Sequence, residues 1–193
     1  TFINWSEGPG KIEQEKSDNA VSMIVDAINA DDELSRHNIK VFPQGSYRAR
    51  TNIKQDSDVD VCVMLKDTIF THYPAGLSDA VVGNSPSSYR FSFFKGSVER
   101  ALINKFGRGQ IKRGNKAFDI HSNSYRVEAD VVPTFEYRSY KTERDLYGKY
   151  LYHSGVKLIT DKGIEIINWP EQTYDNGVKR NDETTRKYKR CIR

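Results

Sequence analysis

The residues with the clearest chemical potential in this sequence are a Gly-Ser pair and two closely spaced carboxylates. Gly45-Ser46 follows a predicted strand over 39–43, and a Gly-Ser pair there leaves backbone N–H groups and a small hydroxyl free to contact a phosphate. Asp58 comes twelve residues after Ser46, and Asp60 lies two further on. Residues two apart on a strand project to the same side, about 6.6–7 Å from each other. Such carboxylates repel unless one is protonated or a cation lies between them, and Mg²⁺ prefers carboxylate oxygens together with substrate phosphates.

Two metal ions held ~3.5–4 Å apart would need a third carboxylate on a neighbouring strand. The segment 127–133 supplies it, because Glu128 and Asp130 share one face and apolar residues take the other. Acidic side chains inside an apolar strand cost free energy unless they are compensated. A lone Asp-x-Asp is usually a solvated strand face, and a lone Gly-Ser is usually a turn. Their conjunction with a third acidic strand about seventy residues later favours a metal site.

A sheet with surrounding helices must position these residues. Residues 58–65 alternate between apolar side chains and Asp, Cys or Met, which predicts a strand with one core face and one face that begins with two carboxylates. The other predicted elements are a helix over 11–36, a strand over 39–43, a weakly structured connection over 67–90, a helix over 92–106, short strands over 111–116 and 117–120, a strand over 125–137, a hairpin of 156–160 and 164–168, and a basic helix from 182 onward.

Composition narrows the class of protein. The 193 residues suffice for one domain, or for one domain and the start of a second. No run approaches the ~20 apolar residues of a membrane span, so we expect no membrane association. Cys62 and Cys191 are too few for a disulfide framework, which favours a reducing, cytoplasmic setting. The net charge of +4 suits a polyphosphate ligand without requiring one.

Three stretches carry a resemblance to a known family. FPQGSYRARTNIKQDSDVDVCV (42–63), VEADVVPTFEYR (127–138) and INWPEQTYDNGVKRNDETTRKYKRCIR (167–193) resemble cGAS/DncV-like nucleotidyltransferases, the bacterial anti-phage signalling enzymes of the DNA polymerase β-type superfamily. The resemblance implies an α+β fold, a mixed sheet flanked by helices. It also implies a nucleotidyltransferase core over 1–180 and, over 181–193, the start of a spine helix that leads to a helical domain outside this sequence.

The resemblance also implies roles for the residues above. Gly45 and Ser46 would hold the triphosphate of an ATP-type donor, and Asp58, Asp60 and Asp130 would ligate two Mg²⁺ ions, with Mn²⁺ as the alternative. An acceptor ribose hydroxyl then attacks the donor α-phosphate and pyrophosphate leaves, which is mostly positioning and charge neutralisation. Asp130 or a neighbour is also a candidate acceptor of the hydroxyl proton.

Four further residues near these motifs are polar and could contact the donor. In the basic segment Arg186-Lys-Tyr-Lys-Arg190, the family places a lysine on the donor triphosphate; Lys189 is the first choice and Lys187 the second. A solvated basic helix face explains either lysine nearly as well. Tyr47 and Arg48 lie within reach of the donor, and we assign neither a role.

The resulting hypothesis is an enzyme that joins NTPs into cyclic or linear oligonucleotide second messengers for antiviral defence. The first alternative is a nucleotidyltransferase that modifies a protein, a small molecule or an RNA end. The second is a non-catalytic nucleotide-binding module, which the intact carboxylates and Gly-Ser pair disfavour. Expected partners are NTP substrates and effector or regulatory proteins encoded nearby. A nucleic-acid activator is not indicated, since zinc-ribbon cysteines are lacking.

Overall fold

The protein is described by a computed structural model over residues 8–52 and 58–192, so residues 53–57 of the first motif and Arg193 of the predicted spine helix lie outside the described residues. Within these ranges one sheet runs through the molecule in the order β1-β2-β5-β4-β3. The strands are β1 (Ile39–Pro43), β2 (Val59–His72), β3 (Ile111–Arg113), β4 (Phe118–Ile120), β5 (Ala129–Arg144), β6 (Tyr150–Ile159) and β7 (Glu165–Asn168). β2 and β5 are parallel and the other pairs are antiparallel, which confirms the predicted mixed sheet.

Strand β5 is the branch point of the sheet. One edge pairs with β2, while the other edge pairs with β4 near its start and with β6 from Phe135 onward. β6 then pairs with β7 in the predicted hairpin. This arrangement brings β2, β5 and β4 side by side at the end of the sheet where the acidic residues lie.

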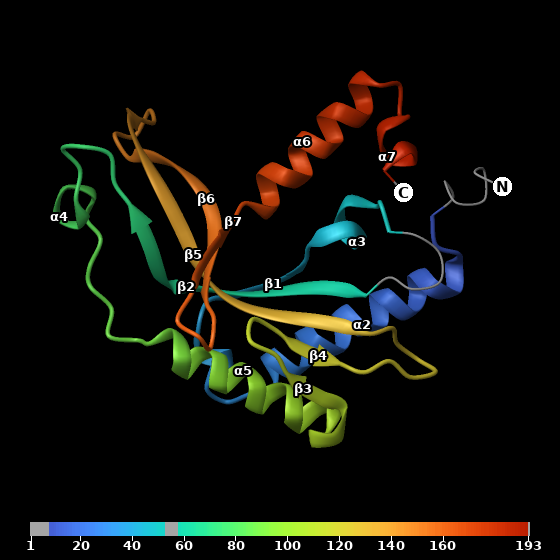
Figure 1. Ribbon diagram of the computed structural model, residues 1–193. Coiled ribbons are helices and arrows are strands. Elements are labelled where there is room, and N and C mark those ends of the chain that lie inside the picture. Colours follow the sequence, from blue (N-terminus) through green and yellow to red (C-terminus); the bar gives the residue numbers. More distant parts are fainter. Residues whose placement is uncertain (1–7, 53–57, 193) are drawn as a thin grey trace.

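Helices cover both faces of the sheet (Figure 1). On one face, α2 (Lys11–Asn29) and α5 (Phe91–Phe106) bury the apolar residues of β2, of which Val59, Val61, Val63 and Leu65 are fully buried. On the other face lie α3 (Gly45–Ala49) and α6 (Pro170–Glu183), above a small cluster that includes Cys62 and Met64. The alternation predicted for 58–65 therefore places the valines in the main core and Asp60, Cys62 and Met64 on the opposite face, where Cys62 and Met64 join the smaller cluster.

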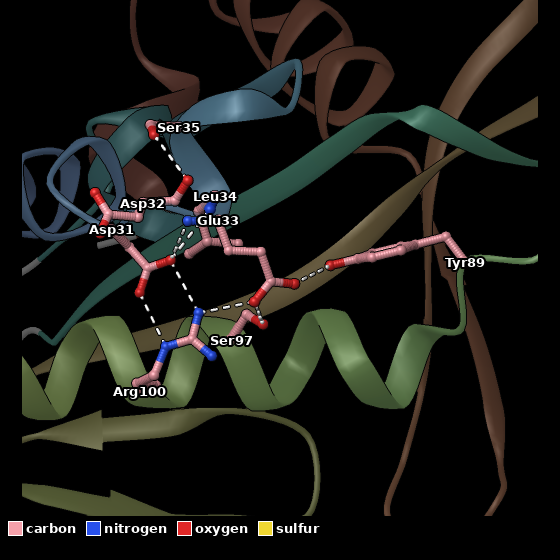
Figure 2. Close-up of polar contacts among 8 residues, drawn as sticks. All are labelled: Asp31, Asp32, Glu33, Leu34, Ser35, Tyr89, Ser97 and Arg100. Atoms are coloured by element: carbon pink, nitrogen blue, oxygen red, sulfur yellow. Dashed lines mark hydrogen bonds and ion pairs between the residues drawn. The ribbon is translucent and has the colours of Figure 1, made fainter.

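An ion-pair network fastens α5 to the turn that follows α2 (Figure 2). Asp31, after α2, accepts backbone N–H bonds from Glu33 and Leu34, which opens the 3₁₀ turn η1 (Leu34–Arg36). Arg100 of α5 donates Nε and Nη2 to both oxygens of Asp31, at 3.1 and 3.0 Å, and Nη2 also reaches Glu33. Burial raises the pKa of Asp31, but the bonds from Arg100 and the backbone outweigh it, so the net pKa lies below the usual value.

Several predicted boundaries were wrong. The connection predicted over 67–90 is partly strand, because β2 passes a register shift after Leu65 and pairs with β5 as far as His72. A short helix, α4 (Asp79–Val82), follows. The strand predicted over 125–137 instead begins at Ala129 and extends to Arg144 with β6 as its partner. The remaining short elements are η2 (Arg108–Gln110) and α7 (Tyr188–Cys191).

The last helix also differs from the prediction. α6 begins at Pro170 and ends at Glu183, where the basic helix was predicted to begin. Proline is well tolerated at the first helical position, and Gly177 lies inside the helix, so neither residue marks a break. The chain turns after Glu183 through the left-handed residues Thr185 and Arg186 into α7. In the described part of the chain, no helix has the length and apolar character needed to cross a bilayer.

Candidate active site

Three neighbouring strands place one carboxylate each at the same level of the sheet. Asp60 of β2 is the Cα partner of Asp130 of β5, and Asp130 is the Cα partner of Asp119 of β4. Asp58 precedes β2 by one residue, two positions before Asp60. The two acidic stretches, 70 residues apart in the chain, are thus adjacent because β2 and β5 pair directly.

The Gly-Ser pair lies against this row of carboxylates. Gly45 opens α3 with a φ of +63°, and a Cβ atom added to it would lie 2.1 Å from Oδ2 of Asp60. The backbone N–H of Gln44 donates to the carbonyl of Asp60 at 2.8 Å, which ties the start of α3 to the start of β2. Only glycine satisfies both the left-handed φ and the close approach.

A pocket of about 530 Å³ opens beside Asp60, between α3, α6 and α7. Its lining includes Gly45, Ser46, Asp60 and Lys189, so residues far apart in the sequence meet there. Lys187 is absent from this lining and begins α7 as its N-cap. The Lys189 ammonium lies 5.9 Å from the ring centre of Tyr174, another lining residue. Of the two candidate lysines, the fold brings Lys189 to the pocket.

A smaller pocket of about 280 Å³ borders the other carboxylates, Asp58, Asp119 and Asp130. Asp119 was not among the predicted site residues. Its signal in the sequence is the alternation of 117–120, where buried Phe118 and Ile120 flank it and leave the aspartate on the opposite face. The Nζ of Lys112, on β3, lies 3.6 Å from a carboxylate oxygen of Asp119.

Burial, together with the crowding of negative charge, raises the pKa of the central carboxylates. For Asp130, burial raises the pKa most, and the charges of Asp119, Asp60 and Asp58 raise it further, to about 6. For Asp60, burial also raises the pKa most, and the charge of Asp58 raises it further. Over 8–52 and 58–192, no three ligating side chains already converge closely enough to hold a metal ion. The carboxylates are neighbours that still repel one another, and a cation would relieve that repulsion.

Comparison with known proteins identifies the family, although no protein-family model matches the chain. A cyclic dipyrimidine nucleotide synthase, CdnE, from Legionella pneumophila is 43% identical over 195 residues, covering 100% of this chain and 65% of that protein. The solved structure of the CdnE c-UMP-AMP synthase of Rhodothermus marinus, with Apcpp and Upnpp, is similar with a TM-score of 0.80 and 28% identity, covering 98% of this chain and 62% of that one. The chain belongs to the cGAS/DncV-like nucleotidyltransferases.

Other members of this family vary in the product their names record. A cyclic dipurine nucleotide synthase from Elizabethkingia meningoseptica is 34% identical over 196 residues, covering 100% of this chain and 64% of that protein. The chain therefore spans slightly less than two thirds of the length of these cGAS/DncV-like relatives.

Other polar residues near the site have partners within the protein. The hydroxyl of Tyr47 donates to Asp18 and accepts a bond from Gln14 at 2.8 Å. Arg48 is ion-paired with Glu171. Cys62 lies 3.2 Å from the hydroxyl of Thr134, and burial raises the pKa of its thiol to about 12. A thiol with such a pKa is a packed residue and no nucleophile.

Proposed function

We propose that this chain is the catalytic core of an enzyme that joins NTPs into cyclic or linear oligonucleotide second messengers. The observation that carries the proposal is the meeting of Gly45, Ser46 and Lys189 on one pocket that Asp60 borders, with Asp130 on the adjacent strand. With a donor bound in this pocket, its triphosphate and the row of carboxylates would lie side by side. Phosphoryl transfer needs mainly positioning and charge neutralisation, which such a layout provides.

Each residue has a proposed role. The N–H groups at Gly45 and Ser46, the Ser46 hydroxyl and the Lys189 ammonium hold the donor triphosphate. The acceptor ribose hydroxyl forms a new bond to the donor α-phosphorus while the bond to pyrophosphate breaks. Asp130 or a neighbouring carboxylate receives the hydroxyl proton. Asp58, Asp60 and Asp130 suit a divalent cation because they are oxygen ligands with mutual repulsion. Mg²⁺, or Mn²⁺, would supply neutralisation of the triphosphate charge when bound.

Pyrimidine nucleotides are the proposed substrates to test first. Two relatives, from Legionella pneumophila and Cecembia lonarensis, are 43% and 40% identical and are both named cyclic dipyrimidine nucleotide synthases. We further propose a cytoplasmic role in anti-phage signalling, together with an effector protein encoded nearby.

The test is a product assay on the full-length protein with all four radiolabelled NTPs and Mg²⁺ or Mn²⁺. A phosphatase-resistant oligonucleotide that contains uridine or cytidine and disappears in Asp60→Asn supports the proposal. Label transferred only when a protein, small molecule or RNA is added would instead show an acceptor-modifying enzyme. Intact NTP binding without any product or transfer would indicate a binding module.

A further inference from the structure

A bidentate ion pair joins α3 and α6, two helices that line the pocket. Arg48 lies in the last turn of α3, and Glu171 lies in the first turn of α6. Nη1 of Arg48 donates to Oε1 of Glu171 at 3.2 Å, and Nη2 donates to Oε2. Two parallel bonds of this kind fix both the distance and the relative orientation of the groups they join.

Aromatic rings hold the same guanidinium in place. Its central carbon lies 4.9 Å from the ring centre of Tyr174 on α6 and 5.7 Å from that of Phe42 on β1. The Arg48 side chain is only 20% exposed. A partly desolvated guanidinium between aromatic faces and a carboxylate gains both cation–π and charge-assisted bonding. A lysine ammonium would not reproduce its planar, two-bond pairing with the carboxylate.

The joined helices position the donor-holding residues of the proposed site. α3 begins with Gly45 and Ser46, and α6 leads to Lys189, whose backbone N–H donates to Oδ1 of Asn181 in α6 at 3.2 Å. We infer that Arg48 and Glu171 are positioning residues that hold α3 and α6 at a fixed separation, so that Lys189 faces the Gly-Ser pair. This inference rests on the proposed function, because it concerns the donor pocket.

The competing explanation is that Arg48 binds the donor phosphate directly, since it also lines the pocket. The two explanations differ in what they expect of Glu171. A phosphate ligand would be freed by loss of Glu171 and would bind the donor at least as well. If the pair instead positions the two helices, removal of either Arg48 or Glu171 would weaken donor binding.

The test measures the dissociation constant of α,β-methylene UTP with Mg²⁺ for the full-length protein, with thermal unfolding measured in parallel. Arg48→Gln and Glu171→Gln should each weaken binding by roughly tenfold to a hundredfold, the scale on which small misplacements act. The loss in the double variant should be far smaller than the sum of the two single losses, because both changes break the same pair. The second change removes only the exposed contact of Glu171 with Lys40. The charge exchange Arg48→Glu with Glu171→Arg should recover part of the affinity.

Glu183→Gln is the matched control, because it breaks the exposed pair with Arg180 inside α6 and leaves α3 untouched. It should leave the dissociation constant unchanged. Unchanged or tighter binding in Glu171→Gln, with weaker binding in Arg48→Gln, would overturn the inference. If either glutamine variant loses its cooperative unfolding transition, Arg48→Lys, Glu171→Asp and their double variant allow the same comparison of single and double changes. Absence of nucleotide binding by the unmodified protein would instead contradict the proposed function.

Discussion

Gly45 and Asp60 lie in such close contact that a single methyl group on Gly45 would overlap a carboxylate oxygen of Asp60, at 2.1 Å. The contact joins the two halves of the proposed site, the triphosphate-holding turn and the carboxylate row. It also explains a residue type, because the φ of +63° and the missing side chain are both needed at this position.

Gly45→Ala should therefore displace either the start of α3 or the Asp60 side chain. We expect a loss of nucleotide affinity and product formation, together with a destabilisation of about 1–3 kcal/mol from strain and steric overlap. Isothermal titration with a non-reacting NTP analogue and thermal unfolding measure the two effects.

Gly96→Ala is the control for this substitution. Gly96 is exposed within α5, and a Cβ atom there meets nothing within 4 Å. Alanine should raise stability by about 0.5–1 kcal/mol and leave nucleotide affinity unchanged. Equal affinity in both variants would contradict the role of the Gly45–Asp60 contact.

Stability should depend on pH and Mg²⁺ through Asp130. The folded protein raises the pKa of Asp130 to about 6, above its usual value, so it holds this proton more tightly than the unfolded chain does. The contribution of this group to stability is present at low pH and is lost as the pH rises through about 6. Mg²⁺ competes with the proton, so the increase in Tm on adding Mg²⁺ should be larger at about pH 7.5 than at about pH 5.

Asp119→Asn tests the cause of that shift. Burial raises the pKa of Asp130 most, and among the neighbouring charges that of Asp119 raises it most. Its removal should lower the pKa of Asp130 and shift the Mg²⁺-dependent stabilisation to more acidic pH. A ¹³C NMR titration of the aspartate carboxyls follows this directly, and an Asp130 signal that titrates unchanged would refute the explanation.

The two candidate lysines should behave differently. Lys189 lines the pocket beside Gly45 and Ser46, whereas Lys187 is absent from that lining. Lys189→Ala should raise KM for NTPs, because it removes a charge-assisted contact to the triphosphate, typically about 1.5–3 kcal/mol. Lys187→Ala should leave KM near its original value. Steady-state kinetics with each variant distinguishes them, and a larger effect at Lys187 would reverse the assignment.

The network around Arg100 should matter for stability and leave nucleotide binding unaffected. Asp31 has a side chain only 5% exposed, and Arg100 is the cation that compensates it. Arg100→Gln should lower the free energy of unfolding by about 1–3 kcal/mol, because a buried carboxylate loses its partner. Lys105→Gln, which removes an exposed pair with Asp26, should change it by less than about 0.5 kcal/mol. Urea denaturation measures both variants, and equal effects would contradict the distinction.

The sequence by itself determined the local pattern of the site. The alternation around Asp58 and Asp60 sets which side chains share a strand face, and this period of two survives in β2, where the valines are buried and Asp60 borders a pocket. The strands and the two core-side helices, α2 and α5, were predicted in their order for the same reason, since apolar periodicity is a local property. The family resemblance added the mixed sheet.

Only the tertiary structure decided which distant residues meet. Asp119 joins Asp130 because β4 pairs with the start of β5, and strand pairing between separate segments leaves no periodic trace in one sequence. The extent of α6 was likewise not predicted, because Pro170 and Gly177 suggest turns locally. Contacts of Glu171 and Tyr174 with Arg48 stabilise a helix there. Non-local contacts can outweigh local propensities of about 1 kcal/mol per residue, and here they set the walls of the pocket.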